Sequence, residues 1–279
     1  MGRGKYYNRW RRFGEAVEHG VYYGGWAAYM AKCLSLQGRL QLDQRVFAVG
    51  AQAPLPLKVA FVSDLHAGPL THAGIFDAIV DAVNAFSPDV VLLGGDYVSL
   101  HHKYVKTFAS RVVRIRSRFG IFGVFGNHDL WLDDQYIKAH LEAAGVRFLV
   151  NSSVRLPDPY ADFSICGLDE PGVGEPDAAS MFSDTAPHRI VVMHSPIGMH
   201  QLAGHRFDIA FCGHTHGGQV ALPNGRPIIL PPGSGDRRFS NGLFQLSEGG
   251  QLLVSRGVGM SDIPIRLFAG SEIHLCTMI

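Results

Sequence analysis

The sequence predicts an α/β protein in which a mainly parallel sheet and a second sheet pack together in one domain. Short apolar runs recur along the 279 residues, and each ends in a cluster of Gly, Asp, Asn or His. Helical patterns separate the early runs, whereas short turns join the later ones. With 47% hydrophobic residues and a net charge of +1, the chain is neither disordered nor a nucleic-acid binder that acts through bulk positive charge.

Five apolar runs are predicted to be strands. They contain Val, Ile, Leu and Phe without strict alternation of apolar and polar residues, which is typical of strands buried on both faces. The runs are residues 58–62, 89–93, 120–125, 189–193 and 207–212. Each run leads directly into residues that bind metals or transfer protons, so we expect a functional site where the strands end.

Helices are predicted between the first strands. Apolar residues recur at helical spacing between Thr71, the predicted N-cap, and Pro88, the predicted stop. Residues 105–115 repeat this pattern, and a third helix is expected from Asp133, as its cap, to Gly145. Strand and helix therefore alternate through the first half of the chain, which indicates a largely parallel sheet with right-handed crossovers.

Four strand-like runs with short connections follow in the last third of the chain. They are residues 219–223, 243–247, 251–255 and 272–278. Short turns usually join antiparallel strands, so we expect these runs to form an antiparallel arrangement. The helix-alternating part and this part would then be the two packed sheets.

Residues 1–53 differ from the rest, and we predict that they form a basic and aromatic extension of a domain that spans residues 54–279. Five of the first twelve residues are Lys or Arg, and an aromatic, Gly-rich stretch follows them. Two interpretations remain open. The extension is either a helix and a strand packed on the domain, or an amphipathic segment within residues 1–35 that contacts a membrane surface as a peripheral element.

Cysteine usage and hydropathy favour a cytoplasmic protein, either free or peripheral on the inner face of the membrane. The four cysteines form no C-x-x-C pair, as is typical of reduced thiols, and no apolar run is long enough to span a membrane. Arg11 and Arg12 leave export by a twin-arginine signal open, although the residues that follow them are polar.

Seven residues that follow the predicted strands are candidate metal ligands, because the carboxyl ends of parallel strands meet in one crevice. They are Asp64, His66, Asp96, Asn127, His194, His214 and His216. Two pairs among them, 64 with 66 and 214 with 216, are two residues apart, and in an extended chain such residues project to the same side. We therefore expect each pair to bind metal from one segment.

The number and kind of these residues predict two metal ions. One divalent ion rarely needs seven nitrogen and oxygen ligands, whereas two ions that share a carboxylate would take four each. Imidazole and carboxylate together favour divalent transition-metal ions, with Mn expected first and Fe or Zn as alternatives. Two such ions about 3.5–4 Å apart hydrolyse phosphate esters by attack of a metal-bridging hydroxide on phosphorus.

These motifs resemble those of the calcineurin-like metallophosphoesterases. All five motifs of that family occur in order between residues 58 and 223. They are Asp64-x-His66, Gly95-Asp96, Gly126-Asn127-His128-Asp129, His194 and Gly213-His214-Thr215-His216. The stretch from Val254 to Ile273 is similar, more narrowly, to the YaeI/YkuE-like bacterial branch, so the resemblance covers residues 56–279.

The resemblance implies a fold and a role for each motif residue. The implied fold is a four-layer α/β/β/α sandwich of two mixed β-sheets flanked by helices. One metal would be bound by Asp64, His66, Asp96 and His216, and the other by Asp96, Asn127, His194 and His214. His128 would donate a proton to the leaving oxygen or bind the phosphoryl charge, and Asp129 would orient His128.

The resemblance also implies hydrolysis of a phosphodiester or pyrophosphate bond. Members of the branch include enzymes that cleave UDP-2,3-diacylglucosamine, so a lipid-linked substrate is one expectation. Arg256, in the C-terminal stretch that is similar to this branch, is the expected substrate contact, and pairing with a local carboxylate is its alternative. A soluble phosphodiesterase or nuclease and a non-catalytic metal-binding interaction module remain as alternatives, although the near-zero net charge disfavours nucleic acid.

Overall fold

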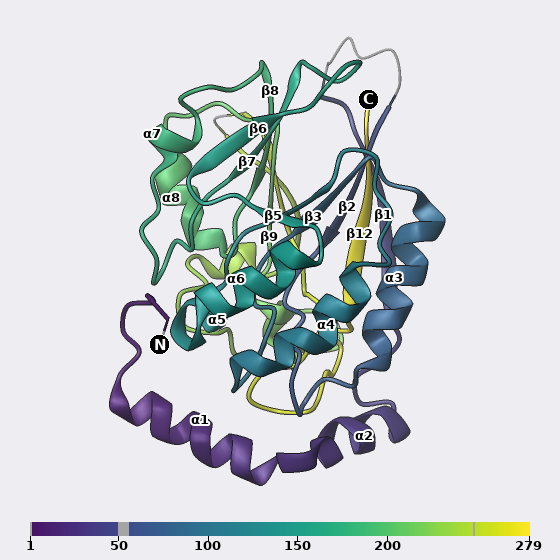
Figure 1. Ribbon diagram of the computed structural model, residues 1–279, viewed down its shortest axis with the longest axis vertical. Coiled ribbons are helices and arrows are strands. Elements are labelled where there is room, and N and C mark those ends of the chain that lie inside the picture. The colour runs from purple at the N-terminus through teal and green to yellow at the C-terminus, as the bar shows by residue number, and fades with distance from the viewer. Residues whose placement is uncertain (1, 50–55, 248) are drawn as a thin grey trace.

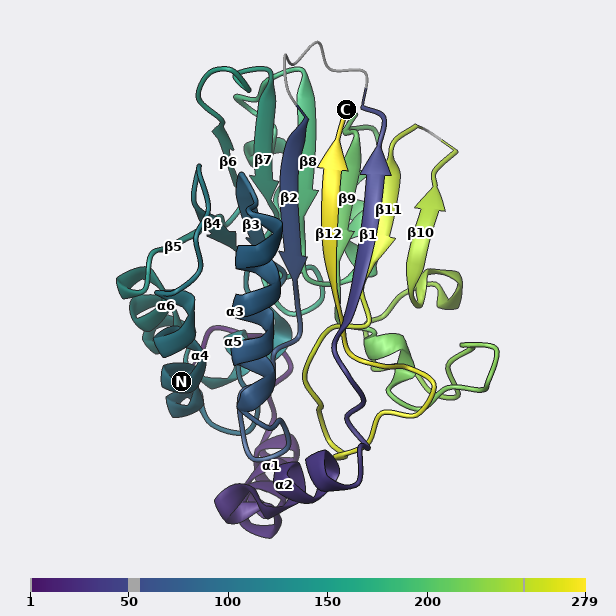
Figure 2. The same cartoon turned by 90° about the vertical axis from the view of Figure 1, so that its right-hand side faces the viewer.

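The computed structural model describes residues 2–49, 56–247 and 249–279, which form two six-stranded β-sheets packed face to face. Helices cover the outer face of each sheet, so the layers run α/β/β/α (Figures 1 and 2). The predicted α/β class and four-layer sandwich are confirmed. Short 3₁₀ helices among these residues are η1 (Tyr23–Gly25), η2 (His102–Tyr104), η3 (Pro196–Gly198), η4 (His216–Gly218) and η5 (Arg237–Phe239).

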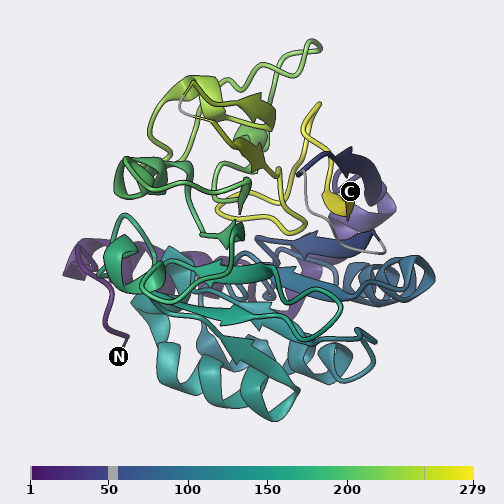
Figure 3. The same ribbon diagram turned by 90° about the horizontal axis from the view of Figure 1, so that it is seen from above.

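The first sheet has the strand order β1-β12-β2-β3-β4-β5. Its strands are β1 (Gln41–Phe47), β2 (Leu57–Val62), β3 (Val90–Leu93), β4 (Ile121–Gly123), β5 (Val146–Phe148) and β12 (Glu272–Met278). Strands β2 to β5 are parallel, as predicted, and the helices between them cover the outer face of the sheet (Figure 3). These helices are α3 (Gly74–Phe86), α4 (Val105–Val112) and α6 (Asp134–Ala143).

The second sheet has the strand order β10-β11-β9-β8-β7-β6. Its strands are β6 (Ser152–Arg155), β7 (Phe163–Gly167), β8 (His188–Val192), β9 (Ile209–Cys212), β10 (Gly242–Gln245) and β11 (Gln251–Val254). The short helices α7 (Ala178–Met181) and α8 (Met199–Leu202) pack on its outer face. The four central strands are parallel, whereas the two edge strands are antiparallel to their neighbours.

The last third of the chain pairs differently from the prediction. Strand β11 is antiparallel to β10 but parallel to β9, and β12 inserts into the first sheet between β1 and β2. Residues 219–223 were expected to be a strand, but Val220 and Ala221 make only isolated bridges. An apolar run identifies a strand without identifying its partner, and the connection between β11 and β12 is long enough to cross to the other sheet.

Buried side chains form three layers that hold the sandwich together. Along β2, Val59 and Phe61 lie in the layer between the two sheets. Ala60 and Val62, which alternate with them, pack against the helices instead. Side chains alternate between the two faces of a strand, and both faces of β2 are covered, so each of these positions is apolar. This packing fixes where the strand ends and thereby where Asp64, two residues later, begins the site.

Two residues were predicted to cap helices, and the structure confirms one of them. Asp133 caps α6 by accepting a hydrogen bond from the Tyr136 backbone N–H at 3.0 Å, as predicted. The prediction for Thr71 is wrong, since α3 begins at Gly74. The Thr71 hydroxyl is buried and instead accepts a hydrogen bond from the Met260 backbone N–H at 3.0 Å. Thr71 therefore joins two loops rather than capping a helix.

The N-terminal residues form two helices at one end of the sandwich and one strand within it. Helices α1 (Arg9–Val21) and α2 (Trp26–Cys33) lie one after the other along the lower end of the molecule in Figures 1 and 2. Strand β1 is parallel to β12 along its whole length. The predicted boundary between residues 53 and 54 lies outside the described residues, so that division stays a prediction. No helix in the described part of the chain is long and apolar enough to cross a membrane.

Candidate metal centre

The seven predicted metal ligands lie together where strands of both sheets end. Asp64 and His66 follow β2, Asp96 follows β3, Asn127 begins helix α5 (Asn127–Leu132) after β4, His194 follows β8, and His214 and His216 follow β9. All seven side chains are buried, with no more than 6% of any residue exposed. Each sheet therefore contributes to one buried polar cluster at the same end of the molecule.

The donor atoms of this cluster form two groups that share Asp96. In the first donor group, the ligand atoms of Asp64, His66, Asp96 and His216 all lie within 4.8 Å of one another. The second donor group is Asp96, His194 and His214, with Asn127 Oδ1 at 3.1 Å from His194 Nε2. The Asp96 Oδ2 atom is 3.4 Å from both His66 Nε2 and His194 Nε2, so this carboxylate lies between the two groups.

The backbone at these residues adopts a rare conformation. Asp64, His66, Asp96, His214 and His216 all have positive φ, between +42° and +69°. Residues other than glycine seldom occupy this left-handed region, and such strain concentrates at functional sites. The extended chain predicted for the pairs Asp64/His66 and His214/His216 is therefore wrong. Left-handed turns, and not an extended strand, bring each pair of side chains into the cluster.

Two glycines of the motifs are required by close packing against ligand carboxylates. A Cβ atom at Gly126 would overlap Asp96 Oδ1, and one at Gly213 would overlap Asp64 Oδ2. Any side chain at either position would displace a carboxylate from its donor group. Glycine therefore allows the backbone to approach and support these carboxylates directly.

In the second donor group, one ring nitrogen of His194 faces one ring nitrogen of His214. His194 Nδ1 is 2.8 Å from the Gly94 carbonyl oxygen, and His214 Nε2 is 3.0 Å from the Pro232 carbonyl oxygen. A carbonyl oxygen only accepts, so these nitrogens carry hydrogen and the other nitrogen of each neutral ring is an acceptor. Those acceptors, His194 Nε2 and His214 Nδ1, are 3.2 Å apart. Two such nitrogens this close need either a proton on one of them or a cation between them, so the group can hold a metal ion in place of that proton.

The first donor group is oriented by two residues that sequence reasoning missed. His66 Nδ1 is 2.8 Å from Ser99 Oγ, so its Nε2 atom is directed into the group. The buried Arg266 guanidinium lies 3.1 Å from His216 Nδ1 and donates to the Gly259 carbonyl oxygen at 2.9 Å. Contacts of this kind fix the ring orientation of metal ligands. Nothing in the sequence marked Ser99, whereas Arg266 lies in the stretch from Val254 to Ile273 that is similar to the bacterial branch, which was its only signal.

The charges within the cluster also favour a bound cation. Burial lowers the pKa of His66 and of His214 to about 3, so both rings stay neutral, as metal ligands must be. Burial alone would also lower the pKa of His194, but the Asp96 carboxylate raises it to about 10. Without a metal, a proton on His194 compensates the buried carboxylate, and a metal cation would take the place of that proton.

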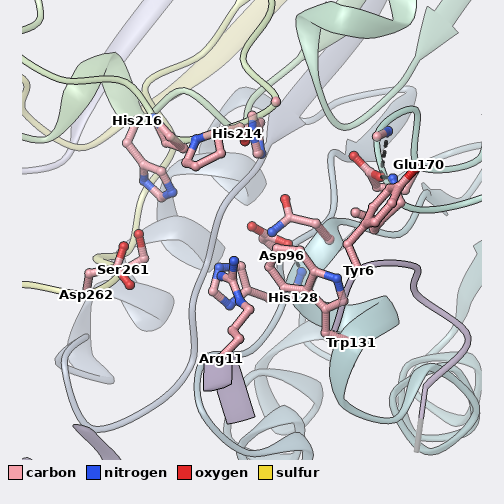
Figure 4. Close-up of a pocket in the computed structure, with 16 residues that line it drawn as sticks. Tyr6, Arg11, Asp96, His128, Trp131, Glu170, His214, His216, Ser261 and Asp262 are labelled. Atoms are coloured by element: carbon pink, nitrogen blue, oxygen red, sulfur yellow. Dashed lines mark hydrogen bonds between the residues drawn. The ribbon is translucent and has the colours of Figure 1, made fainter. Parts of the chain in front are cut away.

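His128 lies beside the donor groups with its ring open to a pocket. Its backbone N–H donates to Asp96 Oδ1 at 2.9 Å, and its ring is 4.9 Å from the His66 ring, centre to centre. The ring nitrogens make no hydrogen bond to any residue that the structure describes, and the ring lines the pocket (Figure 4). This position suits a group that exchanges a proton with a substrate bound over the donor groups.

The expected contact between Asp129 and the His128 ring is corrected by the structure. The Asp129 carboxylate is buried and accepts hydrogen bonds at 2.8–2.9 Å from the backbone N–H groups of Asp96, Tyr97 and Gly126. Asp129 occupies the first turn of α5, from which its side chain turns back onto the preceding backbone. It therefore positions the backbone that carries Asp96 and does not orient the His128 ring.

Arg256 lies outside the pocket, which corrects its expected role as a substrate contact. Its Nε atom donates to Glu272 Oε2 at 2.8 Å, and its Nη2 atom donates to Gln41 Oε1 at 2.8 Å. A guanidinium held by a carboxylate in this way has its charge compensated locally. The alternative, pairing with a local carboxylate, agrees with the structure, and the partner is Glu272.

A pocket of about 310 Å³ opens over the donor groups, and the N-terminal extension forms part of its wall (Figure 4). Among the lining residues that sequence reasoning missed are Tyr6, Arg11, Trp131 and Glu170. The Arg11 guanidinium lies 3.6 Å from the centre of the Trp131 ring and lines the pocket, and its Nε atom pairs with Glu15 Oε1 at 3.0 Å. Arg11 belongs to the basic run that the sequence shows at the start of the chain. The sequence did not show that this run lies beside the ends of the strands.

Specific contacts attach the N-terminal arm, residues 2–12, to the domain. Arg3 donates two hydrogen bonds of 2.6 Å to the Asp169 carboxylate. The backbone N–H of Gly4 donates to the Leu130 carbonyl oxygen at 2.8 Å. The arm is therefore a folded part of the pocket wall.

A four-layer sandwich with a shared-carboxylate donor cluster at its strand ends defines a metal-binding α/β protein. The chain belongs to the calcineurin-like phosphoesterase family, whose model matches residues 57–218. The predicted resemblance to that family is confirmed.

Curated relatives agree with this assignment. An uncharacterized metallophosphoesterase of Campylobacter jejuni is 31% identical over 80% of this chain, and the chain spans 59% of that protein's length. Phosphodiesterase YaeI of Escherichia coli is 27% identical over 96% of this chain and 98% of its own length. The uncharacterized metallophosphoesterase YkuE of Bacillus subtilis is 26% identical over 79% of this chain and 78% of its own length. The predicted similarity to the YaeI/YkuE branch is therefore confirmed.

Proposed function

We propose that the chain is a metal-dependent hydrolase that cleaves a phosphodiester or pyrophosphate bond with two divalent transition-metal ions. The observation that carries this proposal is the pair of buried donor groups that share Asp96 beneath an open pocket. The family and the phosphodiesterase YaeI support the same chemistry. Mn is the proposed metal, with Fe or Zn as alternatives, because the donors combine imidazole and carboxylate.

Each donor group would hold one metal ion, and Asp96 would contact both. A bound pair of such ions activates water and neutralises charge on the phosphoryl oxygens. The chain contributes a rigid arrangement of ligands. The Asp129 carboxylate holds the Asp96 backbone through a hydrogen bond of 2.8 Å, so the shared ligand is in place before substrate binds.

His128 is proposed to protonate the leaving oxygen of the substrate. Its ring lies between the His66 ring, at 4.9 Å, and the Trp131 ring, at 5.4 Å between centres, and is open to the pocket. A proton from this ring would allow an alkoxide-type leaving group to depart as an alcohol. Asp129 supports this step only indirectly, through the backbone.

A lipid-linked substrate such as UDP-2,3-diacylglucosamine is the finer form of the proposal. An apolar groove beside the metal pocket supports it, because Ile228, Ile229 and Ile263 line this groove together with His216 of the first donor group. A soluble phosphodiester is the alternative. A nuclease is disfavoured by the net charge of +1, and a non-catalytic module is disfavoured because every donor position is filled.

Hydrolysis of a substrate panel by metal-reconstituted protein tests this proposal. The panel comprises UDP-2,3-diacylglucosamine, cyclic nucleotides, glycerophosphodiesters and DNA. We expect hydrolysis in the presence of Mn that is lost on chelation, and release of UMP would support the lipid-linked form. Activity on soluble diesters alone would exclude that form. Failure to cleave any phosphoester with Mn, Fe or Zn would contradict the proposal as a whole.

Replacement of Arg11 by Ala is expected to raise KM for bis-p-nitrophenyl phosphate about tenfold with little change in kcat, since one charge-assisted hydrogen bond to a phosphate is worth about 1.5–3 kcal/mol. Arg11 lines the pocket, and its stacking on Trp131 holds the guanidinium there. Steady-state kinetics measure the effect, with Arg9→Ala as the control from an exposed position of the same helix. An unchanged KM in Arg11→Ala would remove Arg11 from the substrate contacts.

A further inference from the structure

The apolar side of helix α1 faces away from the protein. Its large apolar residues recur at helical spacing and are all exposed: Trp10, Phe13, Val17 and Val21. Trp10 is 71% exposed and Phe13 is 65% exposed. An amphipathic surface helix normally buries its apolar stripe against the core, so the orientation of α1 is inverted.

The polar side of α1 contacts the domain instead. Arg11 stacks on Trp131 of the domain, with its guanidinium 3.6 Å from the centre of the ring, and Glu15 accepts a hydrogen bond from the Arg11 Nε atom at 3.0 Å. Further along the helix, His19 Nε2 is 3.0 Å from the Tyr104 hydroxyl. These contacts fix the rotation of the helix, so the exposed stripe is a consequence of specific bonds.

Helix α2 is oriented in the same way. Its small residues Ala27, Ala28 and Ala31 are buried. Its large residues Trp26, Tyr29 and Met30 are exposed. The two helices lie at one end of the molecule (Figures 1 and 2). Their exposed aromatic and apolar side chains are therefore gathered at that end. An exposed apolar surface of this kind marks an interaction site.

A loop of the C-terminal region lies beside these helices and extends their apolar surface. Its exposed residues are Ile263, Ile265, Leu267 and Phe268. The Arg266 backbone N–H donates to the Leu36 carbonyl oxygen at 2.7 Å, which places the loop next to the residues that follow α2. Helices α1 and α2 and the loop of residues 263–268 are called the docking face below.

Positive charge accompanies the docking face. Helices α1 and α2 contain four Lys or Arg and two Glu, although the whole chain has a net charge of only +1. Arg9 and Arg12 are exposed among the apolar residues of α1. The two acids, Glu15 and Glu18, lie partly buried on the domain side, and burial raises the pKa of Glu18 to about 7. The surface offered to a partner is therefore both apolar and basic.

We infer that the docking face binds the surface of an anionic lipid bilayer. Trp and Tyr are favoured at the boundary between lipid and water, and basic residues beside them are attracted to anionic headgroups. A second copy of the chain is a poorer partner, because a two-fold interface would bring together two docking faces that carry the same positive charge. Charge and composition together select a negatively charged surface with an apolar interior.

The docking face also adjoins the mouth of the metal pocket. Arg11 of α1 and Asp262, which immediately precedes the loop of residues 263–268, both line that pocket. A docked molecule would thus hold its donor groups near the phosphates of the lipid headgroups. Delivery of a lipid-linked substrate at the bilayer rests on the proposed function, whereas bilayer binding itself does not depend on hydrolysis.

Vesicle binding tests the inference. We expect the protein to co-sediment with phosphatidylcholine vesicles that contain phosphatidylglycerol, and to do so much less with phosphatidylcholine alone. Trp10→Ser/Phe13→Ser is expected to weaken binding about tenfold, because two aromatic side chains no longer enter the interface. Arg9→Gln/Arg12→Gln is expected to weaken it about fivefold for each arginine and to reduce its salt dependence.

The matched control is Val46→Ser/Val113→Ser, which removes two similarly exposed apolar side chains outside the docking face. This variant should bind vesicles as the unmodified protein does, and thermal unfolding should show that every variant keeps its fold. Unmodified protein that stays in the supernatant with anionic vesicles would overturn the inference, as would unchanged binding of Trp10→Ser/Phe13→Ser. A solution dimer that dissociates in that variant would instead assign the face to a second copy. Absence of hydrolysis with intact vesicle binding would count only against the proposed function.

Discussion

Asp96→Asn is expected to lower kcat/KM for bis-p-nitrophenyl phosphate by about 10³-fold, which corresponds to about 4 kcal/mol in the barrier. Asp96 Oδ2 lies 3.4 Å from an imidazole nitrogen of each donor group, so the substitution removes the negative charge that both groups share. The amide is nearly isosteric and keeps the oxygen that accepts the His128 backbone N–H. The fold should therefore remain while bound metal, measured by plasma mass spectrometry, falls together with activity.

Asp77→Asn is the matched control for this experiment. Asp77 lies at the surface of α3, where its carboxylate pairs with Arg114 at 2.6 Å, outside both donor groups. Its replacement should leave activity and metal content unchanged. An Asp96→Asn protein with full metal content and undiminished activity would show that Asp96 is not the shared ligand.

His128→Ala should slow hydrolysis of alkyl phosphodiesters by about 10²–10³-fold, which is the usual contribution of a general acid. The same substitution should affect bis-p-nitrophenyl phosphate much less, because p-nitrophenolate leaves without a proton. The reason lies in the position of the ring, which is open to the pocket beside the first donor group. The measurement is kcat/KM across esters whose leaving groups differ in pKa, and the dependence should steepen in the variant.

His200→Ala serves as the control, because His200 is exposed on α8 away from the pocket. An equal loss for good and poor leaving groups in His128→Ala would assign the ring to binding phosphoryl charge and not to proton donation. Full activity on every ester would remove His128 from the mechanism.

The grouping of the seven candidate ligands could be predicted because each follows a buried strand. Apolar runs are visible in a sequence, and the polar residues after them are brought together by parallel pairing. Asp64 and His194 come from different sheets, yet the simple rule that strand ends converge was enough to group them. The geometry of the paired motifs was not predictable in the same way. A positive φ at His66 or His214 is set by the packing of the surrounding loops and leaves no mark in the residue types.

Contacts between residues far apart in the sequence, and the direction of side chains in loops, could not be predicted. Arg11 reaches the pocket through an arm held by Arg3 and Asp169, which are 166 positions apart. Arg256 was expected to meet substrate, but Glu272 from β12 neutralises it once that strand inserts into the first sheet. Asp129 was expected to face its neighbour, but helix α5 turns its carboxylate onto the backbone. In each case the outcome depends on a partner that local pattern does not identify.

Both donor groups take residues from both sheets, and this has a thermodynamic consequence. A metal ion would bind only when the two sheets are docked, so each bound ion would act as a cross-link whose stabilisation grows with the logarithm of free-ion concentration. Packing far from the ligands would then contribute to metal affinity, for example Phe61 of β2 against Phe211 of β9, whose ring centres are 5.2 Å apart. Loosening that contact should appear first as weaker metal retention, before any measurable loss of the folded state.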